Sequence, residues 1–358
     1  MGQFTSKKIK VLIVDDSVLI RRLLTDILVT DNLINVIDTA KNGKECIEKT
    51  LLLKPDVITL DIEMPVMDGL ATLEELKKIK PFPVVIILSS LSTVGADSTI
   101  KALELGAADF ITKPKGIFIK DNIKLLKNEL LSKIKNLVKS SYIYKPSEIG
   151  ALHSVIGRKS QLQVKSKDIK YIIGIGTSTG GPKALQDVVC RLPEDIPASI
   201  FIVQHMPAGF TKSLAIRLDG LSNIRVKEAE NGEAAKPGYA YIAPGEYHME
   251  VIDKSGGYEI RTNQNPLVNR HRPSVNVMME SLADLRSKNI IAVIMTGMGA
   301  DGTIGIKKIK EAGGKTIAQN ENTSIIFGMP KSAIQAGVID IVLPLEDIAM
   351  QILKYMEA

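Results

Sequence analysis

The sequence predicts an α/β protein of two domains, each built on a largely parallel β-sheet. Short apolar runs alternate with helical patterns up to residue 138, this alternation resumes after residue 168, and the segment between them loses the periodicity. Alternating strands and helices produce parallel sheets that helices cover on both faces. A length of 358 residues also suits two domains. We therefore predict domains over 1–138 and 169–358, joined by a polar linker over 139–168.

The first domain is predicted to be a five-stranded parallel (βα)5 fold. Apolar residues at helical spacing, such as Val18, Leu19 and Leu23, distinguish its helices from its shorter, continuously apolar strands. The predicted strands are 9–14, 36–39, 56–60, 84–88 and a last strand around 109–113. The predicted helices include 17–30, 44–53, 70–79 and 123–138.

Polar side chains follow the strands of this first domain where the strands end. Asp15 and Asp16 follow the first strand, Asp61 the third, Ser89 the fourth and Lys113 the fifth. Ligands bind beyond the carboxyl ends of parallel strands, so we expect these side chains to share one pocket. Three carboxylates so close together need a cation, and Mg²⁺ prefers oxygen ligands. The sequence therefore predicts a magnesium site.

Bulk composition excludes several classes of protein. The net charge is +6, there is no Trp, aromatic content is 4%, and no nucleic-acid-binding motif is present, so we expect no nucleic-acid partner. No apolar run reaches about 18 residues, so we expect no membrane insertion. Cys46 and Cys190 lie far apart within predicted helices. They indicate reduced, buried thiols and a cytoplasmic location.

The second domain opens with a strand over 171–175 and a helix over 182–189, joined by the glycine-rich segment 174–181. One interpretation is a dinucleotide-binding loop, but the spacing is G-x-G-x-x-x-G, and the acidic residue expected about 20 positions on would be Glu194 or Asp195, beside Pro193. The other is a G-x-S-x-G nucleophile elbow, which lifts Ser178 clear of the sheet. The local residues favour the elbow.

A serine nucleophile needs a base and an acid that orients it. His205 follows a predicted strand over 200–203, which favours it over His248 and His271 as the base. Asp301 lies in a glycine-rich turn after a predicted strand over 290–295. We therefore predict Ser178, His205 and Asp301 at one edge of a doubly wound, mostly parallel sheet. The segment 221–285 is harder to interpret and is expected to include a hairpin near the site.

Residues 9–138 resemble a response-regulator receiver domain, whose three main motifs match segments 14–17, 60–69 and 112–114. The resemblance implies that Asp61 is the phosphoacceptor. It also implies a metal shell of Asp15, Asp16, Asp61 and the backbone carbonyl of Glu63, and the switch and phosphate-sensing residues Ser89, Phe110 and Lys113.

The second half resembles the CheB-type protein-glutamate methylesterases, whose catalytic blocks match 178–182, 203–207 and 295–302. Segments 242–245 and 271–275 also match, and the two resemblances together cover nearly the whole chain. They imply catalytic Ser178, His205 and Asp301 with no cofactor for the esterase chemistry. The chain order Ser…His…Asp differs from that of α/β-hydrolases. We expect the backbone amides of Thr179, first, and Met298, second, to bind the oxyanion.

The family resemblance implies a phosphorylation-regulated hydrolase for sensory adaptation in chemotaxis. Its substrates would be methyl-accepting chemotaxis receptors, which it would demethylate and deamidate, and a chemotaxis histidine kinase would donate the phosphoryl group. We expect a monomer. Two other classes stay open: a receiver-controlled binding protein without turnover, and a nucleotide-dependent oxidoreductase that uses segment 174–181. A DNA-binding output is disfavoured, because no helix-turn-helix pattern is present.

Overall fold

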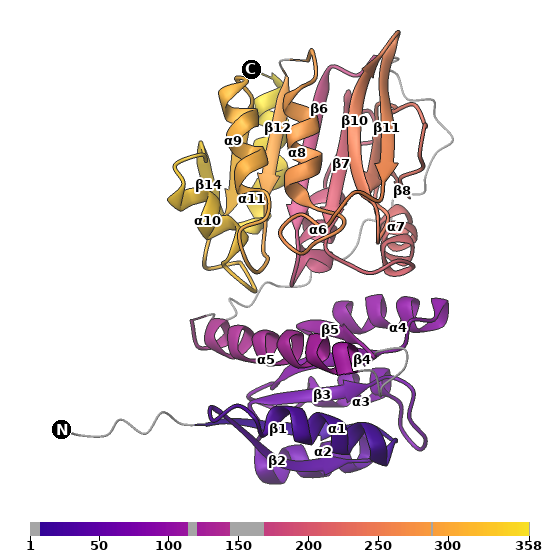
Figure 1. The fold of residues 1–358 in the computed structure, drawn as a ribbon, viewed down its shortest axis with the longest axis vertical. Coiled ribbons are helices and arrows are strands. Elements are labelled where there is room, and N and C mark those ends of the chain that lie inside the picture. The colour runs from indigo at the N-terminus through magenta and orange to yellow at the C-terminus, as the bar shows by residue number, and fades with distance from the viewer. Residues whose placement is uncertain (1–7, 114–119, 144–167, 288, 358) are drawn as a thin grey trace, which may run out of the picture. The chain divides into compact units, whose positions relative to one another are not determined.

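The computed structural model describes residues 8–113, 120–143, 168–287 and 289–357 (Figure 1). The chain divides into two compact units, one within 1–143 and the other within 144–358. Most of the predicted linker and residue 114 of the third receiver motif lie outside the described residues. Within the described ranges, no helix combines the length and the apolar character that crossing a bilayer requires.

The first unit is the predicted five-stranded sheet, with every strand pair parallel and the order β2-β1-β3-β4-β5. Its strands are β1 (Ile9–Val14), β2 (Ile34–Ala40), β3 (Val57–Asp61), β4 (Val84–Ser89) and β5 (Asp109–Thr112). Its helices are α1 (Val18–Leu28), α2 (Gly43–Leu53), α3 (Gly69–Leu76), α4 (Thr93–Glu104) and α5 (Lys120–Ile143).

Short polar residues begin the first four of these helices. Ser17, Asn42, Asp68 and Ser92 each accept a hydrogen bond from the amide three residues further along. Such caps satisfy a backbone donor that the first helical turn leaves free, and each typically contributes about 1 kcal/mol. They therefore fix where each helix begins after its strand, and with it the loops that carry the polar pocket residues.

Two helix ends differ from the prediction. Helix α5 runs to Ile143, so residues 139–143 of the predicted linker are helical. Ser140 does not stop the helix, because its hydroxyl bonds back to the carbonyl of Leu137, 3.0 Å away. Helix α3 ends at Leu76 rather than at 79, shortly before Pro81, whose ring disfavours a helical residue ahead of it.

The second unit contains a seven-stranded sheet of order β14-β13-β12-β6-β7-β9-β8, in which all strand pairs are parallel. Its strands are β6 (Tyr171–Thr177), β7 (Ala198–Gln204), β8 (Arg225–Glu228), β9 (Tyr239–Ile242), β12 (Ile290–Ile294), β13 (Lys315–Gln319) and β14 (Ile341–Leu343). The prediction of a doubly wound, mostly parallel sheet is confirmed.

Helices cover both faces of this sheet (Figure 1). One face carries α8 (Val275–Ala283), α9 (Thr303–Glu311) and α10 (Met329–Gln335), and the other carries α6 (Gly181–Val189), α7 (Phe210–Leu221) and α11 (Leu345–Glu357). A separate antiparallel hairpin of β10 (His248–Lys254) and β11 (Gly257–Asn263) packs against α8. The expected hairpin within 221–285 is therefore present.

The strand order places a switch point at β6. From β6 the sheet continues through β7 on one side and through β12 on the other. Ligands bind outside the carboxyl ends of the strands at such a point. Ser178 directly follows β6, His205 directly follows β7, and Asp301 lies in the loop after β12. The topology thus brings all three predicted catalytic residues to one edge.

The two cysteines differ in burial. Cys46 lies in α2 and is buried, as expected. Cys190 is the C-cap of α6 and is only half-buried, with its sulfur 3.3 Å from the Ser222 hydroxyl. Neither thiol forms a disulfide.

Candidate functional site

The acidic residues of the first unit form one pocket at the carboxyl ends of its strands. Carboxylate oxygens of Asp15, Asp16 and Asp61 all lie within 4.8 Å of one another. Lys113 Nζ lies 2.8 Å from Asp15 Oδ2 and 2.7 Å from Asp61 Oδ2. Asp15 is 0% exposed and Asp61 is 4% exposed, whereas Asp16 is open to solvent. The structure therefore brings together four residues that the sequence placed at the ends of three different strands.

A cavity of about 210 Å³ opens beside these carboxylates. Asp16, Asp61, Glu63, Ser89 and Lys113 are among the residues that line it. Three clustered carboxylates beside a small cavity fit a hard divalent cation such as Mg²⁺. These residues would hold the ion, which would neutralise phosphoryl oxygens on Asp61.

Two further predicted switch residues lie near the pocket. The Ser89 hydroxyl accepts a hydrogen bond from the Thr99 hydroxyl of α4 at 2.7 Å. Phe110 is buried on β5, and Lys133 Nζ lies 5.4 Å from the centre of its ring. Both residues therefore connect the pocket to helices: Ser89 to α4 and Phe110 to α5. Their switch roles stay predictions.

The surroundings of Asp61, the predicted phosphoacceptor, disfavour its ionised form. Burial and the nearby charge of Asp15 raise the pKa of Asp61 to about 6, although the Lys113 ammonium and the Ile62 amide oppose the rise. Burial also disfavours the Lys113 charge, yet hydrogen bonds and attraction from Asp15 and Asp61 raise the pKa of Lys113 overall. A divalent cation would relieve the repulsion between the carboxylates.

Asp61→Asn is expected to stabilise the metal-free protein at pH 8. The pKa of Asp61 rises from 3.8 to about 6 on folding, so its charge costs stability as pH rises through this window. The stabilisation should be roughly 1–3 kcal/mol at pH 8 and nearly absent at pH 4. Thermal unfolding of both proteins with chelator and with Mg²⁺ checks this. Mg²⁺ should stabilise the wild type more than the variant; equal responses would contradict the assigned metal ligands.

In the second unit, the turn after β6 presents Ser178. The Ser178 amide donates to the Thr296 carbonyl at 3.0 Å, and its carbonyl accepts from the Gly181 amide at 2.8 Å. Gly180 has φ +78°, a left-handed conformation that glycine adopts without steric cost. A Cβ at Gly297 would lie 2.8 Å from Ser178 Cβ, so only glycine lets the two loops approach this closely.

Gln204 links the serine turn to the histidine. It is buried at the end of β7, where its Oε1 accepts from the Thr177 hydroxyl at 2.6 Å. Its Nε2 donates to the carbonyls of Ser178 at 3.0 Å and His205 at 3.3 Å. Gln204 was not among the predicted site residues, although a polar amide side chain at the end of an apolar strand is a signal that could have indicated it.

His205 and Asp301 form a buried pair. His205 Nε2 lies 2.9 Å from Asp301 Oδ2. A carboxylate only accepts, so Nε2 carries the hydrogen and Nδ1 holds the lone pair. Nδ1 is buried and has no hydrogen-bond partner among the described residues, Ser178 included. Nδ1 is therefore the ring atom with a lone pair able to accept a proton, and its role as the base stays a prediction.

The carboxylate of Asp301 sits at the N-terminus of α8. It accepts from the amides of Val275 at 2.7 Å and Asn276 at 3.2 Å, and from the Ser274 hydroxyl at 2.8 Å. Asn269 donates to it at 3.4 Å. Burial opposes its charge, but the hydrogen bond and charge of His205, with the Val275 and Ser274 bonds, lower the pKa of Asp301 to about 2.

The α8 and α9 helices cap each other. Asp301, from the loop before α9, caps α8, and Asn276 Oδ1, from α8, accepts from the amides of Gly302 and Gly305, both at 3.0 Å. The first turn of each helix thus finds a hydrogen-bond acceptor that comes from the other helix or from the loop before it. This exchange fixes the position of Asp301 from two directions.

His271 lies against His205, the predicted base. Its ring stacks on that of His205, with centroids 3.8 Å apart and planes within 4°. Burial and the proximity of His205 lower the pKa of His271 to about 4, so it is neutral at pH 7. Sequence reasoning ranked His271 behind His205 as the base; the structure places both rings at the site.

His271→Ala is expected to lower kcat by roughly 10- to 100-fold while leaving KM unchanged. The stacked ring holds the His205 plane against Asp301, and an electron-rich face stabilises the protonated form of His205. His271→Phe keeps a flat ring and should recover most of the activity. Steady-state kinetics and thermal unfolding of both variants check this. Equal kcat values for His271→Ala and the wild type would contradict it.

The predicted oxyanion donors lie on the two loops that meet at Ser178. Thr179 follows the serine, and the Thr296 hydroxyl donates to its carbonyl at 2.9 Å. Met298 follows Gly297, the glycine that packs against Ser178. Their roles as donors stay predictions.

Other sequence candidates lie elsewhere. His248 lies at the start of β10, with Nε2 donating to the Pro266 carbonyl at 3.1 Å rather than to a catalytic group. Glu194 and Asp195 occupy a turn before β7, at the opposite end of that strand from Ser178. An acidic residue that binds a ribose would instead follow a strand, so neither Glu194 nor Asp195 supports the dinucleotide-binding interpretation.

The two sites together define a response regulator whose second domain has the layout of a serine hydrolase. The receiver-domain family, described as "Response regulator receiver domain", matches residues 11–119, and the family "CheB methylesterase" matches residues 173–352. The chain belongs to the CheB methylesterase family, with a receiver domain ahead of the methylesterase domain.

Individual relatives are similar in sequence to this chain over nearly its full length. A protein-glutamate methylesterase/protein-glutamine glutaminase of Geobacillus kaustophilus is 46% identical, covering 97% of this chain and 99% of that protein. Its namesake in Archaeoglobus fulgidus is also 46% identical, covering 97% and 98%. The crystal structure of the Thermotoga maritima CheB methylesterase catalytic domain matches with a TM-score of 0.51 and 46% identity, over 51% of this chain and 97% of that one.

Proposed function

We propose that this protein is a phosphorylation-regulated protein-glutamate methylesterase and protein-glutamine glutaminase. It removes methyl esters from glutamates of methyl-accepting chemotaxis receptors and deamidates selected receptor glutamines, for sensory adaptation. The observation that carries the proposal is the buried His205–Asp301 pair at the sheet edge that also presents Ser178, on a chain with a phosphoacceptor pocket.

The first half of the reaction acylates the serine. His205 Nδ1 takes the Ser178 proton as Oγ attacks the glutamyl ester carbonyl, and Asp301 stabilises the imidazolium that forms. The amides of Thr179 and Met298 hold the negative oxygen of the tetrahedral intermediate. The carbon–oxygen bond to the leaving group then breaks, and methanol departs with the proton from His205.

The second half releases the product. His205 takes a proton from water, which attacks the acyl-enzyme, and the intermediate collapses to free the glutamate carboxylate and reprotonated Ser178. Deamidation follows the same steps with a glutamine amide in place of the ester, so ammonia leaves instead of methanol. This chemistry uses side chains and water alone.

Regulation comes through the acidic pocket. A chemotaxis histidine kinase donates a phosphoryl group to Asp61, with Mg²⁺ held by Asp15, Asp16, Asp61 and the Glu63 carbonyl. Phosphoryl-Asp61 then draws Ser89 and Lys113 inward and shifts Phe110. We place this monomeric protein in the cytoplasm, where receptor tails and kinases of this class are accessible.

Product release by the purified full-length protein tests the proposal. Receptor fragments carrying glutamyl methyl esters should yield methanol, and matched fragments carrying glutamine at the same positions should yield ammonia. A serine-directed fluorophosphonate should label Ser178 and block both. Saturable binding of NAD with no release of either product would instead favour a nucleotide-dependent enzyme, and the absence of label, product and NAD binding would favour a binding protein.

A further inference from the structure

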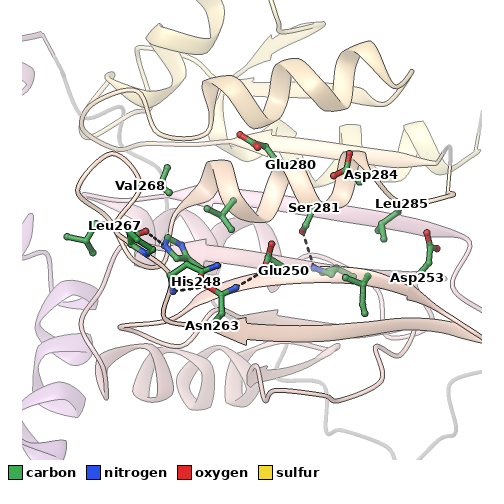
Figure 2. A pocket seen from close by; sticks show the side chains of 15 residues that line it. His248, Glu250, Asp253, Asn263, Leu267, Val268, Glu280, Ser281, Asp284 and Leu285 are labelled. Atoms are coloured by element: carbon green, nitrogen blue, oxygen red, sulfur yellow. Dashed lines mark hydrogen bonds between the residues drawn. The ribbon is translucent and has the colours of Figure 1, made fainter.

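A cavity of about 640 Å³ lies between the β10–β11 hairpin, α8 and the loop that joins β11 to α8 (Figure 2). We call it the hairpin cavity. Its size lies within the range of small-molecule and side-chain pockets. Apolar side chains form part of its wall, including Val251, Val277 and Leu285. None of the groups that carry the proposed chemistry lines it.

The polar lining of the hairpin cavity is acidic. Glu250 and Asp253 come from β10, Glu280 comes from α8 and Asp284 is the C-cap of that helix, whereas no lysine or arginine is among the lining residues (Figure 2). The apolar wall suits an aliphatic stem, and the carboxylates suit a cationic head. The lining therefore favours a long cationic side chain over an anion.

These carboxylates are incompletely neutralised. The Glu250 side chain accepts a hydrogen bond from the Asn263 amide at 2.5 Å, and the charge of Asp284 contributes to raising the pKa of Lys308. Glu280 pairs with Lys308 at 2.7 Å, and Asp253 lies 4.0 Å from an Arg286 side chain that is 90% exposed. An arriving cation would meet the Glu250 carboxylate, which no ion pair within the described residues neutralises.

His248 points independently to a hydrogen-bond donor as ligand. It is 1% exposed, its side chain lines the hairpin cavity, and its Nε2 lies 3.1 Å from the Pro266 carbonyl (Figure 2). The carbonyl only accepts, so Nε2 is the donor and Nδ1 is left as an acceptor. Nδ1 is buried and has no partner among the described residues. A buried acceptor without a partner costs free energy that a donor group would recover.

Two lining residues of the hairpin cavity belong to segments that contact the proposed catalytic residues. Val268 lines it and exchanges two backbone hydrogen bonds with His271, at 3.1 and 2.9 Å, and His271 stacks on His205. Val277 lines it from the first turns of α8, the helix whose initial amides hold Asp301. A partner that fills the cavity thus contacts the segments that position the base and its acid.

We propose that the hairpin cavity is a docking site for an arginine side chain of the protein substrate. The inference rests on the proposed function, because the partner is the protein that carries the reacting glutamyl group. The forked guanidinium offers five donors, enough to bind carboxylates from β10 and α8 together with His248 Nδ1. Lysine, with a compact ammonium, binds less well.

Charge neutralisation without change of shape tests the docking site in the full-length protein. The double variant Glu250→Gln/Glu280→Gln should raise KM for a methylated receptor fragment roughly tenfold. Its kcat, and its turnover of the small ester p-nitrophenyl acetate, should stay at the wild-type level. The matched control Glu311→Gln/Glu321→Gln makes the same charge change at exposed positions outside the cavity and should leave KM unchanged. An equal KM for both double variants would overturn the inference.

Direct binding separates this inference from the proposed function. A fluorescent five-residue alanine peptide with a central arginine should bind the wild type saturably, lose binding in Glu250→Gln/Glu280→Gln, and weaken with salt. Matched peptides with citrulline or lysine, and free arginine, should bind more weakly. If the citrulline peptide or free arginine binds as well, the docking site is wrong. If the wild type releases no methanol, the proposed function fails, and the peptide comparison alone decides the cavity.

Discussion

Ser178→Ala is expected to reduce methanol release from methylated receptor by about 10⁴-fold or more. Every covalent step begins at Ser178 Oγ, so its removal leaves only binding and the oxyanion donors. The backbone of the turn should persist, because its hydrogen bonds to Thr296 and Gly181 come from main-chain atoms. Single-turnover release at saturating enzyme measures the loss without interference from affinity.

Two controls make the Ser178 result specific. The variant should unfold at nearly the wild-type temperature, since the serine is half-buried and contributes little packing. It should also bind methylated receptor with unchanged affinity. A Ser178→Ala protein that releases methanol at the wild-type rate would eliminate the serine mechanism, whatever the family relationship.

Asp301→Asn is expected to lower kcat by about 10³- to 10⁴-fold, the second-largest effect of the account. The carboxylate accepts the Nε2 hydrogen of His205 at 2.9 Å, which leaves the lone pair on Nδ1. An amide in its place offers an N–H to Nε2 and favours the opposite tautomer, in which Nδ1 cannot accept the serine proton. The amide also fails to stabilise the imidazolium.

The same substitution has a stability signature. The pKa of Asp301 falls from 3.8 to about 2 on folding, so its charge adds stability that is fully present above pH 3.8 and is lost as pH falls through 2. Asp301→Asn should therefore cost roughly 2 kcal/mol at pH 7 and much less near pH 2. Denaturant unfolding across this range measures it; a cost independent of pH would contradict the assigned hydrogen bonds.

The positions that the sequence predicted well share one property: they end strands. Asp15, Asp61, Ser178 and His205 each stand within one or two residues of a buried β run, and parallel pairing brings such ends together without any knowledge of tertiary contacts. The parallel pairing of both sheets followed from the alternation of strands and helices, whereas the strand orders came from the structure. This is why the pocket and the serine–histidine edge were predictable from local pattern.

What escaped prediction depends on contacts across long stretches of chain. The amides that hold Asp301 belong to residues 275 and 276, and the ring that stacks on His205 is 66 positions away. Segment 264–274 has no regular hydrophobic periodicity, so the sequence pattern could not predict that this segment lies next to the site. Gln204 likewise acts through side-chain bonds to a neighbouring strand end.

If Asp61 controls a hydrolase centred on Ser178, methanol release must respond to phosphorylation at Asp61. Methanol release from methylated receptor by the full-length wild type and by Asp61→Asn is followed with and without a small phosphodonor and Mg²⁺. We expect that the phosphodonor accelerates the wild type, that Asp61→Asn keeps its basal rate without acceleration, and that chelation of Mg²⁺ removes the wild-type response. Acceleration of Asp61→Asn equal to that of the wild type would contradict the claim.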